Sequence, residues 1–351
     1  MKNETDMIKA ALISVRRPVS GTVFLQAIAR IGQVFGPRHF WLAVLWLAVM
    51  PVTAQEWCRY APLVTPSQEW EHRWVTCPLA DSLSHVWFRQ TYVTGSDEDV
   101  PVSAHLSFAS SGLVRVYVNE CNVGTAQWYS PSEPISIDIT PYLNEDTNVV
   151  AVLYAPRVLR PENRHLSLSY YGFTESGRPF CYMADSTWLC RVSPASGWLP
   201  DGGEWDDGRE AENPWRASQF DPALWMSAEE IDSDISSPDI CGKTGVGTEM
   251  ASVSVSLSHV QGKSYFDPEK CAVNYAFSNG IYGQVRLTLR DARYGEVIRY
   301  GRNIYICNGE MDEQASPLFS LDGFSRVYVS GDRYFQRSQI WDIEALTEVY
   351  D

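Results

Sequence analysis

Positive charge is scarce in this sequence. Its 351 residues include 28 Lys and Arg against 43 Asp and Glu, so the formal net charge at pH 7 is −15. Proteins that bind nucleic acid by neutralising its phosphates need a basic face. The composition therefore argues against a nucleic-acid partner.

Long apolar runs are scarce as well. The run at residues 41–50 has ten residues, about half of the roughly 20 that a helix needs to span a bilayer. It is followed by the small residues Val52 and Ala54, a pattern typical of a secretory signal. We therefore interpret residues 1–54 as a signal-peptide region that is cleaved before Gln55, with a short membrane anchor as the alternative. We expect an exported protein, periplasmic or extracellular, with no membrane span after cleavage.

The common catalytic and metal-binding motifs are absent. The chain has no G-x-S-x-G, no C-x-x-C and no H-x-x-x-H spacing. Residues 241–245 look like the end of a phosphate-binding loop, but Ser237 occupies the place of its first glycine. We assign no catalytic residue and no metal ligand. A glycosidase-type pair of acids stays open, because it depends on a distance in space that sequence spacing does not show.

All eight cysteines follow residue 54. An even number of cysteines in an exported chain predicts disulfides, and eight cysteines allow 105 connectivities. Cys181 and Cys190 enclose a stretch whose centre is typical of a turn. A bridge across this hairpin is the most local pairing.

Helical periodicity is minor, and a period of two dominates instead. In residues 113–119, Val114, Val116 and Val118 alternate with Arg115 and Tyr117, as in a half-buried strand. The same alternation recurs at residues 135–139, 149–154, 166–170, 253–257 and 285–289. The pattern predicts an all-β protein with two jelly-roll or β-sandwich domains.

Composition shifts along the chain suggest the domain boundaries. Ser, Asp, Gly and Pro crowd together in residues 232–250, which we interpret as a linker. A lead-in segment at residues 55–83 precedes the first sandwich, residues 84–231. The second sandwich would take residues 251–351.

Aromatic side chains are abundant, with 13 Trp, 18 Tyr and 13 Phe. They suit β-sheet cores, and they also suit surfaces on which sugars stack. Trp128 and Tyr129 lie in a loop between two predicted strands and are candidates for carbohydrate binding. The alternative is that Trp128 closes the end of the sandwich.

A second candidate sugar site lies in the acidic, Trp-rich segment 195–217. Its rings, carboxylates and guanidinium are the groups that hold a sugar; they belong to Trp205, Asp206, Asp207, Arg209 and Trp215. The alternative is that an Arg–Asp pair fixes a long loop.

Other polar residues favour structural interpretations. His85 and His105 fall inside predicted strands, where a buried histidine with satisfied hydrogen bonds is expected. Residues 97–99 and 201–207 are acidic but do not match the twelve-residue calcium loop. We assign no cofactor, and calcium stays open.

Several runs occur in a specific order between residues 84 and 231. They are Trp87-Phe88-Arg89, residues 113–119, Gly124 with Trp128, residues 137–143 and 148–152, the D-x-x-W segment 185–188, residues 207–210, Trp215 and residues 220–225. In this order they resemble the N-terminal β-sandwich, a galactose-binding-like jelly roll, of bacterial α-L-rhamnosidases.

The second half resembles the next β-domain of that family more loosely, through residues 283–289, 294–298, 322–324 and 327–331. Two positions depart from the family pattern. Asn119-Glu120 stands where Asn-Gly is common, and Ser325-Arg326 replaces Arg-Tyr after Gly-Phe.

The resemblance implies a role in carbohydrate recognition without catalysis. The family's catalytic carboxylates lie on a helical barrel that has no counterpart in this sequence, so none can be carried over. We expect a secreted carbohydrate-binding or accessory protein that is not an enzyme on its own, and a glycan containing rhamnose or galactose as its partner. Two alternatives are a front fragment of an α-L-rhamnosidase whose catalytic subunit is separate, and a structural module that binds another protein.

Overall fold

The computed structural model describes residues 73–96, 99–126, 135–157, 164–231, 253–259 and 264–350. All of them belong to one compact unit, residues 63–351. The predicted signal region and the linker at residues 232–250 lie outside the described residues and stay predictions. In the described part, no helix has the length and apolarity needed to cross a membrane.

The predicted all-β class is confirmed. The described residues form strands and three short 3-10 turns, without an α-helix. The strands expected from the alternating runs are all present. Residues 74–76 of the predicted lead-in also form a strand, which joins the first sheet.

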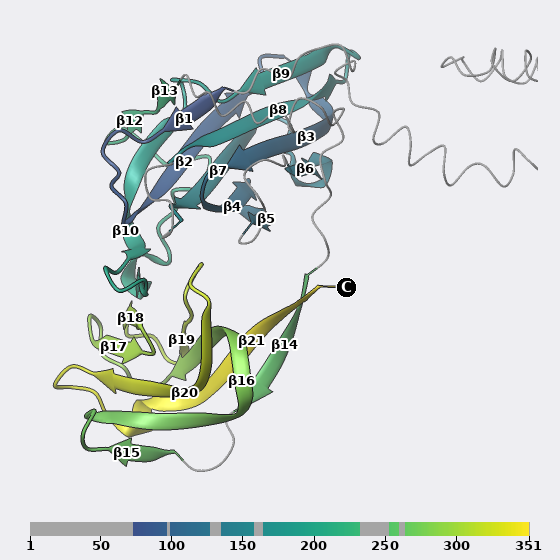
Figure 1. Ribbon diagram of the computed structural model, residues 1–351. Helices are drawn as coiled ribbons and strands as arrows, with labels where there is room; N and C mark the ends of the chain where they lie inside the picture. The colour runs from purple at the N-terminus through teal and green to yellow at the C-terminus, as the bar shows by residue number, and fades with distance from the viewer. Residues whose placement is uncertain are drawn as a thin grey trace, which may run out of the picture. The chain divides into compact units, whose positions relative to one another are not determined.

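The first sandwich consists of two facing antiparallel sheets (Figure 1). One sheet has the order β13 (Glu229–Ile231), β1 (Trp74–Thr76), β8 (Leu166–Thr174), β3 (Pro101–Ser110), β6 (Ile135–Asp138), with β9 (Pro179–Met183) also on β8. The other has the order β10 (Leu189–Trp198), β2 (Ser84–Val93), β7 (Thr147–Ala155), β4 (Leu113–Val118), β5 (Cys121–Ala126), with β12 (Met226–Ser227) also on β10.

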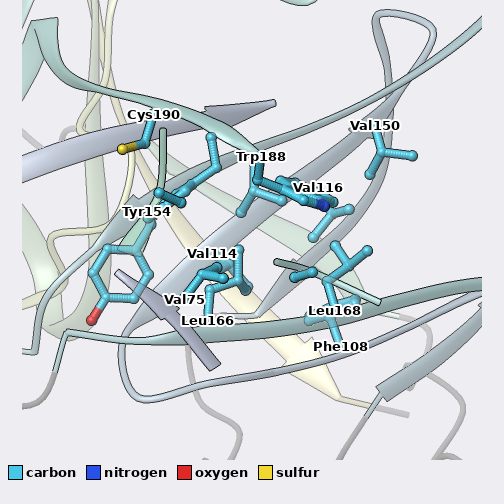
Figure 2. Packing of buried hydrophobic residues seen from close by; sticks show 14 of the residues in the cluster. Val75, Phe108, Val114, Val116, Val150, Tyr154, Leu166, Leu168, Trp188 and Cys190 are labelled. Carbon is cyan, nitrogen blue, oxygen red and sulfur yellow. The ribbon is translucent and has the colours of Figure 1, made fainter. Parts of the chain in front are cut away.

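Alternate residues of both sheets form the core between them. Val114 and Val116 of β4 meet Leu166 and Leu168 of β8, and Trp188 packs against the same cluster (Figure 2). All five side chains are at most 1% exposed. Successive strand residues point to opposite faces of a sheet. The alternation of apolar and polar residues in the sequence therefore predicts which side chains face the core.

The outer face of the β10–β2–β7–β4 sheet is buried too. Trp87, Tyr117 and Leu153 point away from the first core and pack with Trp198, Trp215, Trp225 and Phe319. Two of these covering tryptophans come from the segment after β10. The sheet is therefore enclosed on both sides.

The second sandwich begins at β14 (Val253–His259), and its order is β14, β21 (Ile340–Tyr350), β16 (Ala272–Leu289), β20 (Asp322–Gly331), β17 (Val297–Tyr300), β18 (Asn303–Ile306). Strands β15 (Tyr265–Asp267) and β19 (Glu313–Ala315) pair with β16. Leu287, Ile298, Val329 and Ile343 are among the buried residues of its core.

Strand β11 (Glu204–Asp207) joins the two sets of strands. It pairs antiparallel with β10 through Trp205 and Gly197, and parallel with β18 through Trp205 and Ile304. Both of its edges are therefore hydrogen-bonded, and the predicted acidic loop contains a strand.

The predicted hairpin and bridge at Cys181 and Cys190 are wrong. Cys181 lies on β9 in the first sheet, whereas Cys190 lies on β10 in the second. Both are free thiols, Cys181 exposed and Cys190 buried. The turn-like residues between them carry the chain from one sheet to the other, so Cys181 and Cys190 do not face each other across a hairpin.

The two-residue turn between β4 and β5 is the place where Asn119-Glu120 replaces the Asn-Gly that is common in the family the sequence resembles. Asn119 has φ +48° and Glu120 has φ +69°, as in a type I′ hairpin turn. The Asn119 side chain accepts a hydrogen bond from the Val149 amide (2.9 Å) and donates to Asn148 Oδ1 (2.8 Å). Glu120 also adopts a left-handed backbone, which is unfavourable for a residue with a Cβ, and its side chain makes no hydrogen bond to a described residue.

We expect Glu120→Gly to raise the free energy of unfolding by about 1 kcal/mol, because glycine removes the Cβ penalty at positive φ. Urea unfolding of the two proteins measures the change. Asn119→Gly is the control, and it should be destabilising because it loses three side-chain hydrogen bonds, to Tyr142, Asn148 and Val149. A destabilised Glu120→Gly would contradict this interpretation of the turn.

Candidate functional site

Trp205 and Asp206 are consecutive residues of β11, so their side chains point to opposite faces of the strand. Gly197 of β10 leaves room for the Trp205 indole, because a Cβ added there would meet Trp205 Nε1 at 2.6 Å. Trp205 is half-buried. One of its faces is thus given to packing against β10.

Asp207 and Arg209 form the ion pair that was the structural alternative for this segment. Arg209 Nε and one terminal nitrogen donate to the two Asp207 oxygens at 2.8 and 2.7 Å. Asp207 also caps the 3-10 turn Gly208–Glu210 by accepting from the Arg209 amide. The guanidinium lies over the ring of Tyr294, so these contacts fix the turn.

Trp215 lies within the outer core rather than on the surface. It is 6% exposed and stacks on Trp87, with ring centroids 4.9 Å apart and an interplanar angle of 5°. Tyr117 and Trp225 contact its other sides. The structure thus brings Trp205, Asp206 and Arg209 onto one short segment and sets Trp215 apart from it, and sugar binding at these residues stays a prediction.

We expect Trp215→Ala to lower the free energy of unfolding by about 3–5 kcal/mol, because it removes a buried aromatic ring and leaves a cavity. Chemical denaturation with tryptophan fluorescence measures this loss. Trp341→Ala, at a tryptophan that is 64% exposed, is the matched control and should cost much less. Equal losses of unfolding free energy in the two variants would show that the buried Trp87–Trp215 stack contributes no more to stability than an exposed tryptophan does.

Glu204 is a buried carboxylate that binds the second sandwich. It is 1% exposed, and its Oε2 accepts the backbone N–H groups of Phe319 (2.9 Å) and Ser320 (2.8 Å). His85 lies nearby, with Nδ1 3.9 Å from Glu204 Oε1 and 2.9 Å from Ser196 Oγ. Burial lowers the pKa of His85 to about 3, so this histidine is neutral. It is buried as predicted, but its Nε2 has no hydrogen-bond partner among the described residues, so the expected satisfaction of the ring holds only at Nδ1.

Burial also raises the pKa of Glu204 to about 7. The pKa of Asp206 rises to about 7 as well, because of burial first and the Glu204 charge second. Raised carboxyl pKa values are common at catalytic sites. Here Glu204 is enclosed by packed strands, so the raised value reflects burial, and we assign it no catalytic role.

The raised pKa of Glu204 determines how this group changes the free energy of unfolding with pH. Its folded value lies above the ordinary 4.5, so the folded state holds more protons than the unfolded state between about pH 4.5 and 7. Stability from this group is lost as pH rises through that window and is constant above it. His85 has the opposite effect. Its pKa is lowered on folding, so its contribution to stability rises with pH up to its ordinary pKa of 6.5.

We therefore compare Glu204→Gln with the unmodified protein, because the His85 contribution is common to both. Relative to that protein, the variant should gain stability from pH 5 to 7, by up to about 1.4 kcal/mol per pH unit from the Glu204 proton itself. Loss of the Glu204 charge also lowers the pKa of Asp206, which adds a change in the same direction. Urea unfolding at several pH values measures the difference, and Glu175→Gln, on an exposed turn, is the control. A difference that does not change with pH would overturn the assignment.

Of the acidic residues considered for calcium, Asp97 and Glu98 lie outside the described residues, and two of the others already have hydrogen-bond partners. Asp201 Oδ1 accepts the Gly203 amide, and Asp207 binds Arg209. Within the described ranges, the group of side chains close enough to hold a metal is His259, Asp342 and Glu344. Arg286 already donates to Glu344, which weakens the case for a cation there.

A cavity of about 390 Å³ opens at one end of the first sandwich. Four aromatic rings from β2, β8 and β9 form its wall: Tyr92, Tyr170, Phe180 and Tyr182. Centroids of Tyr92 and Tyr170 are 4.8 Å apart, and those of Tyr92 and Tyr182 are 5.3 Å apart. Tyr170 is 2% exposed, whereas Tyr182 is 51% exposed. The wall therefore runs from the core to the surface.

Polar groups line the rest of this cavity. Arg178 and Asp99 form an ion pair in its lining, and both side chains keep substantial exposure. Asp99 also accepts a hydrogen bond from Ser96 Oγ at 2.9 Å. Asn148, a third lining residue, is occupied by the backbone of Asn144. An apolar ring wall with a few fixed polar groups is the usual make-up of a ligand site.

Sequence reasoning missed this cavity. Tyr92 lies far from the other three rings in the chain, and none of the four falls in a tryptophan-rich or acidic segment. The alternation of Phe180 and Tyr182 on β9 is a signal that places two rings on one face of a strand. Trp128 and Tyr129, the other predicted sugar contacts, lie outside the described residues.

No family model matches the sequence, and no curated protein matches it. Solved structures do. One is an α-L-rhamnosidase from Dictyoglumus thermophilum, with 16% sequence identity and a TM-score of 0.67; the match covers 81% of this chain and 36% of that one. Another is the α-L-rhamnosidase from Aspergillus terreus, with 17% identity and a TM-score of 0.66; the match covers 82% of this chain and 37% of that one. A third, from Streptomyces avermitilis in complex with L-rhamnose, is 16% identical with a TM-score of 0.62, covering 77% and 29%.

At these identities the likeness concerns the fold. The chain is a β-sandwich protein built like part of the α-L-rhamnosidases, and it spans about a third of their length. A shared fold does not carry an activity with it. The cavity, rather than the shared fold, is therefore the feature that indicates a function.

Proposed function

We propose that this chain is a secreted, non-catalytic carbohydrate-binding or accessory protein of the α-L-rhamnosidase type, and that it binds a rhamnose- or galactose-containing glycan in the aromatic cavity. The observation that carries the proposal is the partly exposed wall of tyrosines beside the Asp99–Arg178 pair. The rhamnosidase fold supports it from a second direction.

The chemistry of a sugar matches the two sides of this cavity. A pyranose has an apolar C–H face, which packs on an aromatic ring, and a rim of hydroxyl groups. Tyr182 presents a ring that is half exposed. Asp99 accepts and Arg178 donates, so the pair can bind neighbouring hydroxyls with opposite polarity.

The net charge of −15 favours a neutral glycan over a strongly anionic one. We expect weak binding, with a Kd of about 0.1–1 mM or roughly −4 to −5.5 kcal/mol per site. Weak single sites are useful in accessory proteins, because they keep a catalyst near a polymer without immobilising it.

We also propose a separate catalytic glycosidase subunit as a partner. The support is that the chain corresponds to about a third of the length of the rhamnosidases it resembles. In that arrangement the catalytic carboxylates would belong to the partner.

We expect Tyr182→Ala to weaken binding of free L-rhamnose or D-galactose about tenfold or more, which corresponds to about 1.4 kcal/mol of lost ring contact. Isothermal titration with each sugar measures it on the full chain. Tyr265→Ala is a matched control, because Tyr265 is also 51% exposed but lies on β15 of the second sandwich. It should leave binding unchanged.

Two results would count against the proposal. Binding that is equal in the Tyr182→Ala and Tyr265→Ala variants would place the sugar elsewhere. Binding of neither sugar at millimolar concentration, together with co-purification of a partner, would favour a structural module. A parallel rhamnoside hydrolysis assay tests the non-catalytic role, and turnover by the purified chain would overturn it.

A further inference from the structure

Two buried cysteines lie in the same core although they come from opposite sheets. Cys77 directly follows β1 and is 4% exposed, and Cys190 on β10 is fully buried. Both belong to the cluster that fills the first sandwich. Figure 2 shows Cys190 beside the other core side chains.

The short strap formed by β12 and β13 brings these two positions together. Met226 of β12 pairs with Cys190, and Glu229 of β13 pairs with Thr76, the residue before Cys77. Ala228 lies between the two pairings, and its amide donates to the Trp188 carbonyl at 2.7 Å. The strap thus crosses from one sheet to the other at the two cysteines.

The two thiols contact each other directly. The Cys190 side chain hydrogen-bonds the sulfur of Cys77, and this bond lowers the pKa of Cys77 to about 7 while it raises the pKa of Cys190. A lower pKa increases the thiolate fraction, which is the form that attacks a disulfide.

We propose that Cys77 and Cys190 form a disulfide that links the two sheets when the chain meets a disulfide oxidant such as oxidised glutathione. The Cys77 thiolate attacks one sulfur of the oxidant and releases its other half as a thiol. Cys190 then loses its proton, attacks Cys77 and displaces the second half. Two thiols are oxidised, and one oxidant disulfide is reduced to two thiols.

Other described cysteines are less suited to this reaction. Cys121, Cys181 and Cys271 are exposed on separate strands or turns, and Cys307 is buried in the core of the second sandwich. The pairing is therefore specific, and it replaces the hairpin bridge that the sequence suggested.

Peptide mapping of the full chain tests the pairing. Reduced protein is refolded with oxidised glutathione, remaining thiols are alkylated after denaturation, and the digest is analysed by mass spectrometry without reduction. We expect a linked peptide pair containing Cys77 and Cys190. A Cys190 that is alkylated, bound to glutathione, or linked to Cys181 would overturn the proposal, and this readout needs no variant that folds.

Thermal unfolding provides the second readout. The bridge would close a loop of more than 100 residues, so the oxidised protein should melt about 5–15 °C above the reduced one. Cys190→Ala should abolish this difference, whereas Cys181→Ala, the matched control, should keep it. Neither result depends on sugar binding. Equal melting temperatures of the oxidised and reduced unmodified protein would contradict a stabilising bridge.

Discussion

The burial of one sheet on both of its faces is the constraint on which the rest of this structure depends. In the β10–β2–β7–β4 sheet, Val114 and Val152 pack inward while Tyr117 and Leu153 pack outward. An antiparallel sheet with two apolar faces needs two covers. The first cover is the facing sheet, and the second is the segment after β10, whose tryptophans close over Trp87. That segment resembled a functional loop in sequence because its composition is that of a binding surface. Its rings are instead used to exclude water from the sheet.

This constraint decides which rings of the first sandwich a ligand can reach. The rings over the covered sheet are closed to solvent, whereas the rings at the end of the sandwich line an open cavity. Tyr92 and Tyr170 extend the core outward, and Tyr182 brings the ring wall to solvent. A binding site built as the continuation of a core is rigid, because its inner rings are held by packing, and a rigid site loses less entropy when it binds. The fold shared with parts of the α-L-rhamnosidases supplies the scaffold, while these residues supply the groups on which the proposed sugar site depends.

Much of the fold could be predicted from the sequence, because alternation is a local signal. Val114, Val116 and Val118 face the core as their spacing predicts. Burial of a tryptophan is not local, since Trp215 differs from an exposed ring only in what packs against it. The predicted bridge between Cys181 and Cys190 is wrong for a related reason. A turn does lie between them, but there the chain passes from the first sheet to the second instead of forming a hairpin. The cavity joins Tyr92 to Tyr182 across two strands that are not neighbours in sequence, and only register and packing bring them together.

Strand β11 shows how the cover and the second sandwich depend on each other. Residues 204–206 pair with β10 on one edge, and residues 205–207 pair with β18 on the other. Glu204 also binds the amides of Phe319 and Ser320, and Asp207 forms an ion pair with Arg209. Burying a carboxylate is unfavourable unless its oxygens are bound. Glu204 meets this condition at one oxygen through backbone N–H groups, which cannot swing away as side chains can. Its contribution is therefore positional: it fixes the chain at residues 318–320 against His85 and Arg115, where an apolar residue of equal size would pack but would not set the register.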